Sequence, residues 1–148
     1  MDHTRKIDGR FNLVGGDFTN AGEASTQLKK ILQLRGVKDS YIRRASIATF
    51  EAEMNVIIYT PAGILRYDVD DESIKITVED MGPGIEDIDL AMQEGYSTAP
   101  EWVREMGWGA GMGLPNMKKN SDVFRIDSAP GEGTTVKMII YLNKGEQS

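Results

Sequence analysis

The chain has 148 residues, 40% of them hydrophobic and 27% charged, and its net charge is −6. This length fits one folded domain spanning residues 1–148, with residues 1–6 and 144–148 expected to be frayed. There is no cysteine and a single histidine, His3, which excludes disulfides and thiolate metal sites and argues against a Ser-His-Asp triad. No apolar run approaches the roughly 20 residues that cross a bilayer, and the negative charge disfavours nucleic-acid binding. We therefore expect a cytoplasmic protein that contacts neither a membrane nor nucleic acid.

The first part of the chain predicts one strand followed by two helices. The predicted elements are, in order, a strand over 6–18, a helix over 20–35 and a helix over 40–59. Gly15-Gly16 interrupts the strand, Asp17 or Thr19 is expected to cap the first helix, and Asp39 the second. The core face of the second helix is expected to carry Ile42, Ala45, Ala48 or Thr49, Ala52 and Val56.

The rest of the chain predicts two strand pairs separated by helices and a long loop. The predicted elements are, in order, strands over 64–69 and 74–78, a helix over 85–93, a loop over 95–113, a helix over 114–120, and strands over 123–128 and 134–142. This order indicates an α+β fold. We expect a two-layer sandwich in which helices cover one face of a mixed β-sheet. A loop as long as the one predicted here is usually functional in a compact domain.

The helix predicted over 40–59 carries a carboxylate and an amide on one face. Glu51 and Asn55 are four residues apart, so their side chains project on the same side. An amide oxygen can bind Mg²⁺, which prefers oxygen ligands, and a carboxylate one turn earlier can accept a proton near the same ion. The alternative is a surface glutamate beside a buried asparagine bonded to backbone, which is the commoner arrangement for such a pair taken alone.

A second chemical motif directly follows the strand predicted over 74–78. It reads Glu79-Asp80-Met81-Gly82-Pro83-Gly84-Ile85, and its two glycines around a proline favour a tight turn with exposed backbone. Asp80 at the strand end can accept a hydrogen bond from an exocyclic amine such as that of adenine. An acidic strand-to-helix turn without a ligand explains the same pattern equally well.

Glycine occupies every second position from Gly107 to Gly113. Such spacing lets backbone N–H groups close around phosphates, and the N-terminus of the helix predicted over 114–120, with Pro115 in its first turn, adds a favourable dipole. The alternative, a flexible linker, is disfavoured because the segment precedes a strand pair that the domain needs. The segment is not a Walker A loop, since no Gly-Lys-Ser/Thr follows, and it lies too near the C-terminus for a Rossmann fingerprint.

The order and spacing of these motifs resemble the N, G1 and G2 boxes of the gyrase–Hsp90–histidine kinase–MutL (GHKL) ATPase superfamily. The match comprises Glu-x-x-x-Asn, Asp-x-Gly-x-Gly-Ile, Gly-x-Gly-Leu and a final Gly133-Thr134-Thr135, and it covers about residues 44–142. The resemblance implies the Bergerat ATP-binding fold, with ATP and Mg²⁺ as its ligands.

The resemblance also implies a role for each motif. Asp80 binds the adenine amine with the help of Gly84 and of the Thr134 hydroxyl. Asn55 coordinates Mg²⁺, and Glu51 accepts the proton of the attacking hydroxyl. Gly109, Gly111 and Gly113 belong to a loop that closes over the nucleotide as a lid, and they wrap the phosphates. The residues expected to contact the nucleotide or its metal are Asn55, Asp80, Gly82, Gly84, Ile85, Gly109, Gly111, Met112, Gly113, Leu114 and Thr134.

Within the superfamily, the chain is similar to the small switch kinases and anti-sigma factors of stress and sporulation pathways. It has no room for the transducer domains of gyrase, Hsp90 and MutL, and His3 cannot serve as a histidine kinase's phospho-acceptor. Residues 79–88 and 91–98 resemble RsbT-type switch kinases, and 98–113 is similar to RsbW and SpoIIAB. The chain departs from many relatives in lacking His-Gly after Asn55 and in a longer lid at 102–108.

That likeness implies a serine/threonine protein kinase that transfers the γ-phosphate of ATP to a Ser or Thr of a STAS-domain partner. Two alternatives stay open: an anti-sigma factor that sequesters a sigma factor, and an ATP-gated binding module with little catalysis. A homodimer is compatible with each. Trp102 and Trp108 either pack the lid shut or form a partner-binding surface.

Overall fold

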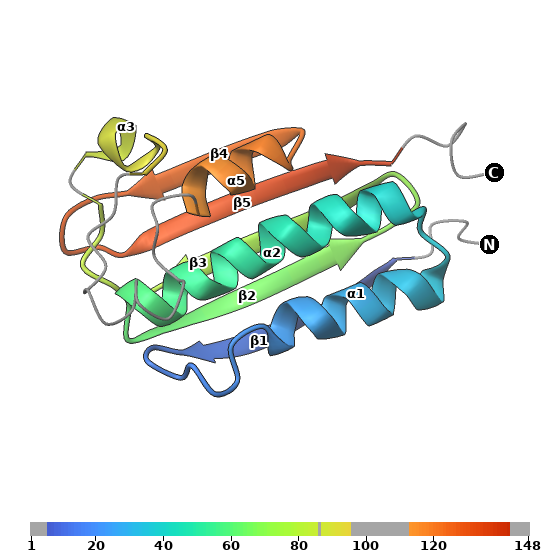
Figure 1. Ribbon diagram of the computed structural model, residues 1–148, viewed down its shortest axis with the longest axis horizontal. Coiled ribbons are helices and arrows are strands. Elements are labelled where there is room, and N and C mark those ends of the chain that lie inside the picture. The colour runs from blue at the N-terminus through green and yellow to red at the C-terminus, as the bar shows by residue number, and fades with distance from the viewer. Residues whose placement is uncertain (1–5, 86, 96–112, 143–148) are drawn as a thin grey trace.

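The computed structural model describes residues 6–85, 87–95 and 113–142, which form helices on one side of a single sheet (Figure 1). The sheet has five strands in the order β1-β2-β3-β5-β4. The strands are β1 (Ile7–Val14), β2 (Ala62–Val69), β3 (Ser73–Asp80), β4 (Val123–Ser128) and β5 (Thr134–Tyr141). The predicted two-layer α+β architecture is confirmed.

The sheet differs from the prediction in two ways: β1 ends at Val14, before the Gly15-Gly16 turn, and not at residue 18, and all four strand pairings are antiparallel, where a mixed sheet was predicted. Parallel neighbours need a crossover connection, usually through one helix. Here β1 and β2 are joined through two successive helices, and the pairs β2–β3 and β4–β5 are joined by short turns. The chain therefore reverses direction between each of these neighbours.

Among the described helices, three cover one face of the sheet, and a short fourth lies near the end at which β3 stops (Figure 1). The described helices are α1 (Glu23–Arg35), α2 (Asp39–Tyr59), α3 (Ile88–Ala91) and α5 (Gly113–Lys119). The helices predicted over 40–59 and 114–120 therefore appear within one residue of their expected bounds, while the one predicted over 85–93 is shorter. In the part of the chain that the structure describes, no helix combines the length and apolarity needed to span a bilayer.

The core lies between α1, α2, α5 and the inward face of the sheet. Its fully enclosed side chains are Leu28, Leu32, Leu65, Val69, Ile74, Ile76, Met117, Met138 and Ile140. Every residue predicted for the core face of α2 is buried. Three of these are alanines, whose small side chains let α2 pack closely against its neighbours. This packing holds the C-terminal half of α2 over the sheet.

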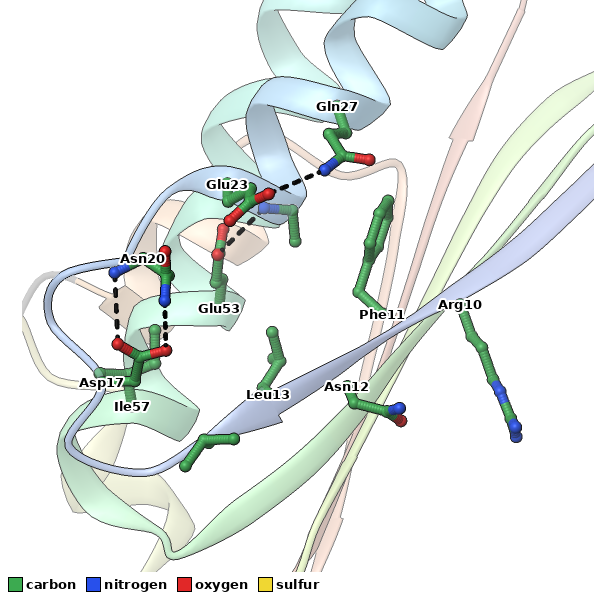
Figure 2. A pocket seen from close by; sticks show the side chains of 12 residues that line it. Arg10, Phe11, Asn12, Leu13, Asp17, Asn20, Glu23, Gln27, Glu53 and Ile57 are labelled. Carbon is green, nitrogen blue, oxygen red and sulfur yellow. Dashed lines mark hydrogen bonds between the residues drawn. The ribbon is translucent and has the colours of Figure 1, made fainter.

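The start of α1 differs from the prediction because its cap comes from another helix. α1 begins at Glu23, with Gly22 at the cap position and no local side-chain cap. Instead the Glu53 carboxylate of α2 accepts hydrogen bonds from the backbone N–H groups of Gly22, Ala24 and Ser25 at 3.1, 3.2 and 3.1 Å. Figure 2 shows Glu53 pointing at the first turn of α1.

Two of the three side chains predicted as caps, Asp17 and Asp39, have other roles. Asp17 accepts hydrogen bonds from the backbone and side chain of Asn20, at 3.3 and 2.9 Å, and so closes the turn before α1 (Figure 2). Asp39 is the first residue of α2 rather than its cap, since Lys38 occupies the cap position. There its negative charge still favours the helix N-terminus.

Candidate functional site

The motif residues Glu51 and Asn55 lie on α2 next to the start of α5. A Cβ built on Gly113 would lie 3.4 Å from Glu51 Oε2 and 3.7 Å from Asn55 Oδ1. The last glycine of the glycine-rich segment thus meets both polar side chains, which are far from it in sequence. Because Gly113 carries no side chain, a small space stays open between its backbone, the carboxylate and the amide.

Asn55 does not behave as a buried amide tied to backbone. Its side chain is half-buried, and among the described residues it has no hydrogen-bond partner. A polar side chain in the interior normally finds a partner, so one that lacks it at the border of an open space is available to a ligand.

Glu51 has the electrostatics expected of a group that accepts protons. Partial burial raises the pKa of its carboxyl above the ordinary value, and a hydrogen bond with the Asn116 side chain lowers it by a smaller amount. A pKa closer to neutrality makes a carboxylate a stronger base. Asn116 lies on α5, three residues after Gly113, and therefore also orients Glu51. Sequence reasoning missed Asn116; its only signal was its position one turn into a helix that follows the glycines.

Asp80, at the end of β3, is held by backbone hydrogen bonds on one of its two oxygens. Asp80 Oδ1 accepts from the N–H of Gly82 at 2.9 Å and of Thr134 at 3.1 Å. The side chain is half-buried. Both bonds use Oδ1, and no described residue donates to Oδ2, which can therefore accept from a ligand. The turn that follows lies against the end of α2, since a Cβ on Gly82 would sit 2.7 Å from Thr60 Cγ2.

Ser128 links the two turns that flank Asp80, and sequence reasoning missed it. Its Oγ accepts from the N–H of Ile85 at 2.7 Å, donates to the carbonyl of Gly133 at 3.0 Å and lies 2.7 Å from Thr134 Oγ1. A serine hydroxyl has one proton, and the Gly133 carbonyl takes it. The Thr134 hydroxyl must then donate to Ser128, which leaves the lone pairs of Thr134 Oγ1 free to accept. No motif marked Ser128, because its role depends on the β4–β5 pairing.

Gly84 can only be glycine in this arrangement. Its φ is +81°, a left-handed conformation that L side chains rarely adopt, and a Cβ there would lie 2.0 Å from the carbonyl oxygen of Ala129. Gly131 donates a backbone hydrogen bond to Pro83 across the same contact. The predicted tight turn is therefore locked against the β4–β5 turn, and this fixes the direction of Asp80.

The remaining predicted site residues divide into two groups. Leu114 is buried and Ile85 packs against the core, so each anchors its segment from the apolar side. Gly109, Gly111 and Met112 lie outside the described residues, as do Trp102 and Trp108. In the described ranges no group of three or more His, Cys, Asp and Glu side chains is placed to hold a metal ion.

Two cavities, of about 320 Å³ each, open on the helical side of the described residues. The one in Figure 2 lies between β1 and the start of α1, and none of the predicted site residues lines it. The other lies between α1 and α2. Its wall includes Lys29, Ser46, Phe50 and Glu51, so Glu51 borders both this cavity and the space at Gly113.

The chain is similar to known proteins over most of its length. Residues 42–144 match the family model described as histidine kinase-, DNA gyrase B-, and HSP90-like ATPase. The chain is 35% identical over 103 residues to the serine/threonine-protein kinase RsbT of Bacillus subtilis, covering 67% of this chain and 71% of that protein. It is 29% identical over 124 residues to the anti-sigma F factor of Caldanaerobacter subterraneus, covering 84% and 79%. Among solved structures, the SiaB–SiaC complex from Pseudomonas aeruginosa contains a chain with the same fold, at a TM-score of 0.62 and 15% identity over 89% of this chain and 88% of that one.

Proposed function

Because the chain belongs to the histidine kinase-, DNA gyrase B- and HSP90-like ATPase family, we propose that it is a serine/threonine protein kinase that transfers the γ-phosphate of ATP to a Ser or Thr of a STAS-domain partner. The observation that carries the proposal is the meeting of Glu51, Asn55 and Gly113. A nucleotide-binding module without chemistry has no need of a half-buried carboxylate at this point. The likeness to the kinase RsbT supports the same conclusion.

The residues around Asp80 fit an adenine nucleotide. Asp80 Oδ2 is oriented by the two bonds to Oδ1 and can accept a hydrogen bond from the exocyclic amine, while the Thr134 hydroxyl offers a second acceptor for a bridging water. Gly82 keeps a side chain out of the space beside the carboxylate, since a Cβ there would lie 3.2 Å from Asp80 Oδ1. Phosphates would then extend toward Gly113 and the N-terminus of α5.

The surroundings of Asn55 fit Mg²⁺. Asn55 Oδ1 is a potential metal ligand that has no hydrogen-bond partner among the described residues, and it lies beside a glycine that leaves room. Mg²⁺ commonly takes one or two protein oxygens together with substrate phosphates and water. When bound, it would neutralise charge on the phosphates.

Glu51 is the proposed base. In the transfer step the acceptor hydroxyl oxygen bonds to the γ-phosphorus, the bond from that phosphorus to ADP breaks, and the hydroxyl proton passes to the Glu51 carboxylate. The raised pKa of Glu51 favours this. Glu51 also borders the cavity between α1 and α2, and this supports an approach of the partner's Ser or Thr from that side.

The direct test is phosphoryl transfer. Proteins that the chain captures in the presence of ATP and Mg²⁺ are identified by mass spectrometry, then incubated singly with it and with γ-labelled ATP. We expect label on a Ser or Thr of a STAS-domain protein that was captured from a cytoplasmic extract. Absence of label on every captured STAS-domain protein would refute the kinase.

A second function is favoured by the likeness to anti-sigma F factors. Under it the chain sequesters a sigma factor, either as a monomer or as a homodimer, and phosphorylation is a side activity at most. The two candidates separate in one experiment, because a sequestering protein inhibits transcription by its sigma factor when it is saturated with a non-hydrolysable ATP analogue. A kinase without that role leaves transcription unchanged.

Asp80→Asn should weaken ATP binding by about 1–3 kcal/mol, the size of a lost hydrogen bond to a charged group. The two backbone N–H groups will retain the amide oxygen at the position of Oδ1, so the new NH₂ group takes the place of Oδ2 and faces the adenine amine, donor against donor. Titration calorimetry measures the affinity, with Asp127→Asn, an exposed carboxylate on β4, as the control. Wild-type protein should prefer ATP to GTP, and equal affinities would contradict the assignment.

Asn55→Ala should remove the dependence of ATP binding on Mg²⁺, with affinity in saturating Mg²⁺ reduced by about 10–100-fold. Its affinity in excess chelator should match that of wild type, because the adenine contacts are untouched. Asn12→Ala, at an exposed position on β1, is the matched control. An unchanged Mg²⁺ dependence would show that Asn55 is a structural amide.

A further inference from the structure

The face of the sheet opposite the helices carries a row of cations that crosses the strands. Arg10 on β1 pairs with Arg66 on β2, Arg66 with Thr77 on β3, Thr77 with Lys137 on β5, and Lys137 with Arg125 on β4. The strand positions that alternate with these point into the core, as Leu65, Val78 and Val136 do. The four basic side chains, which we call the cation row, therefore lie in one line on the open face.

This row conflicts with the stability of the sheet. Arg10 and Arg66 are direct cross-strand neighbours, and so are Lys137 and Arg125; like charges placed opposite each other on antiparallel strands are destabilising. Opposite charges on facing residues would avoid this repulsion, as in the pair of Lys75 and Asp68 elsewhere on this face. Local choices that oppose the fold concentrate at functional positions.

Little inside the described chain relieves the repulsion. Arg66 forms an ion pair with Glu79 at 2.9 Å. Arg10, Arg125 and Lys137 are exposed, and within the described residues none of the three has an ion-pair partner. The protein as a whole has a net charge of −6, so three cations without an ion pair in the described residues stand against the overall charge.

The geometry points to a protein partner: we infer that the cation row docks an extended acidic segment of another protein, laid across the strands. Strand spacing of about 4.8 Å puts the centres of the two like-charge pairs about 14 Å apart. In an extended chain, residues i and i+4 lie on the same side and about 13 Å apart. Two carboxylates at that separation can each sit between two cations. Such docking holds a partner on the face opposite the nucleotide-binding side and does not depend on phosphoryl transfer.

The rows beside the cation row distinguish a narrow acidic segment from a nucleic acid. Asp8 and Asp68 lie two residues away on one side, and Glu79 and Asp127 on the other, at about 7 Å along the strands. A duplex or a folded nucleic acid would bring phosphates over these carboxylates as well as over the cations. One acidic strand would contact the cations alone.

The test is binding of a fluorescein-labelled peptide of alternating glutamate and threonine, followed by anisotropy at low salt. We expect Arg10→Thr/Lys137→Thr to weaken binding about tenfold, since it breaks both cation pairs, and raised salt to abolish binding by wild type. The control variant Lys30→Gln/Arg43→Gln removes the same charge from exposed positions on α1 and α2 and should stay within about twofold of wild type. A peptide of alternating glutamine and threonine should not bind.

The same variants test the energetic premise. Arg10→Thr/Lys137→Thr should melt at the same temperature as wild type or higher, because it removes like-charge neighbours and adds residues that favour strands. A lower melting temperature than the control variant's would mean that the row stabilises the sheet, which would overturn the inference. Equal weakening of peptide binding in both variants would overturn it too, as would tighter, row-dependent binding of an oligothymidylate.

Discussion

Glu51→Gln is expected to lower the rate of phosphoryl transfer by about 10²–10⁴-fold, the range typical when a general base is removed. ATP affinity should stay close to that of wild type, because Glu51 is proposed to contact the acceptor proton and not the nucleotide. The amide keeps the size of the carboxylate and can still bond with Asn116, so the geometry beside Gly113 is preserved. Single-turnover transfer from γ-labelled ATP to the partner measures the rate, and calorimetry measures the affinity.

The same variant has a second expected signature that does not involve catalysis. Because the pKa of Glu51 is raised in the folded state, the folded protein holds a proton that the unfolded chain has already lost, between the ordinary value of 4.5 and the raised pKa. Stability therefore falls as pH rises through that window. Glutamine cannot titrate, so Glu51→Gln should gain melting temperature relative to wild type on going from pH 4 to neutral pH.

Glu72→Gln is the matched control for both measurements, since Glu72 is exposed at the β2–β3 turn, at the other end of β3 from Asp80. It should leave transfer unchanged. Full transfer activity in Glu51→Gln would eliminate Glu51 as the base. Loss of ATP binding together with transfer would instead mean that Glu51 supports the nucleotide directly, and the separation of catalysis from binding would fail.

Most of the fold was predictable because its signals are local. Alternation along β3 and helical spacing along α2 identified those elements to within two residues, and β5 was predicted to within one. The error at α1 has a different origin: Asp17 and Thr19 are suitable caps by sequence, but the cap is Glu53, about 30 residues away. Nothing in the sequence near α1 records that contact.

The candidate site shows the same contrast between residues with local sequence signals and residues that act through tertiary contacts. Glu51 and Asn55 share a helix face, and Asp80 ends a strand, so their types and spacing are visible in the sequence. Asn116 and Ser128 are not, because each acts through a partner on another element: Asn116 through Glu51 on α2, and Ser128 through the turns after β3 and before β5. Residues that orient a site depend on tertiary packing and are the hardest to predict from sequence.

Glu53→Ala is expected to destabilise the protein by about 3 kcal/mol, which corresponds to a fall of roughly 6–12 °C in melting temperature for a chain of this size. Glu53 is 1% exposed, and its two oxygens accept three backbone hydrogen bonds at the start of α1. Removing the carboxylate leaves those N–H groups without an acceptor and removes a negative charge from the positive end of the helix dipole. Urea unfolding followed by circular dichroism measures the change.

Two further variants separate the buried cap from a general effect of negative charge near α1. Glu23→Ala removes an exposed carboxylate from the first turn of the same helix and should cost about 0.5 kcal/mol or less. Glu53→Gln keeps one acceptor but turns an NH₂ group toward backbone N–H donors, so its loss of stability should fall between the two. If Glu53→Ala were no less stable than Glu23→Ala, the cap would contribute nothing to the fold. Since α2 carries Glu51 two residues before Glu53 and Asn55 two residues after it, loss of the cap should also loosen α1 against the helix that bears the proposed base.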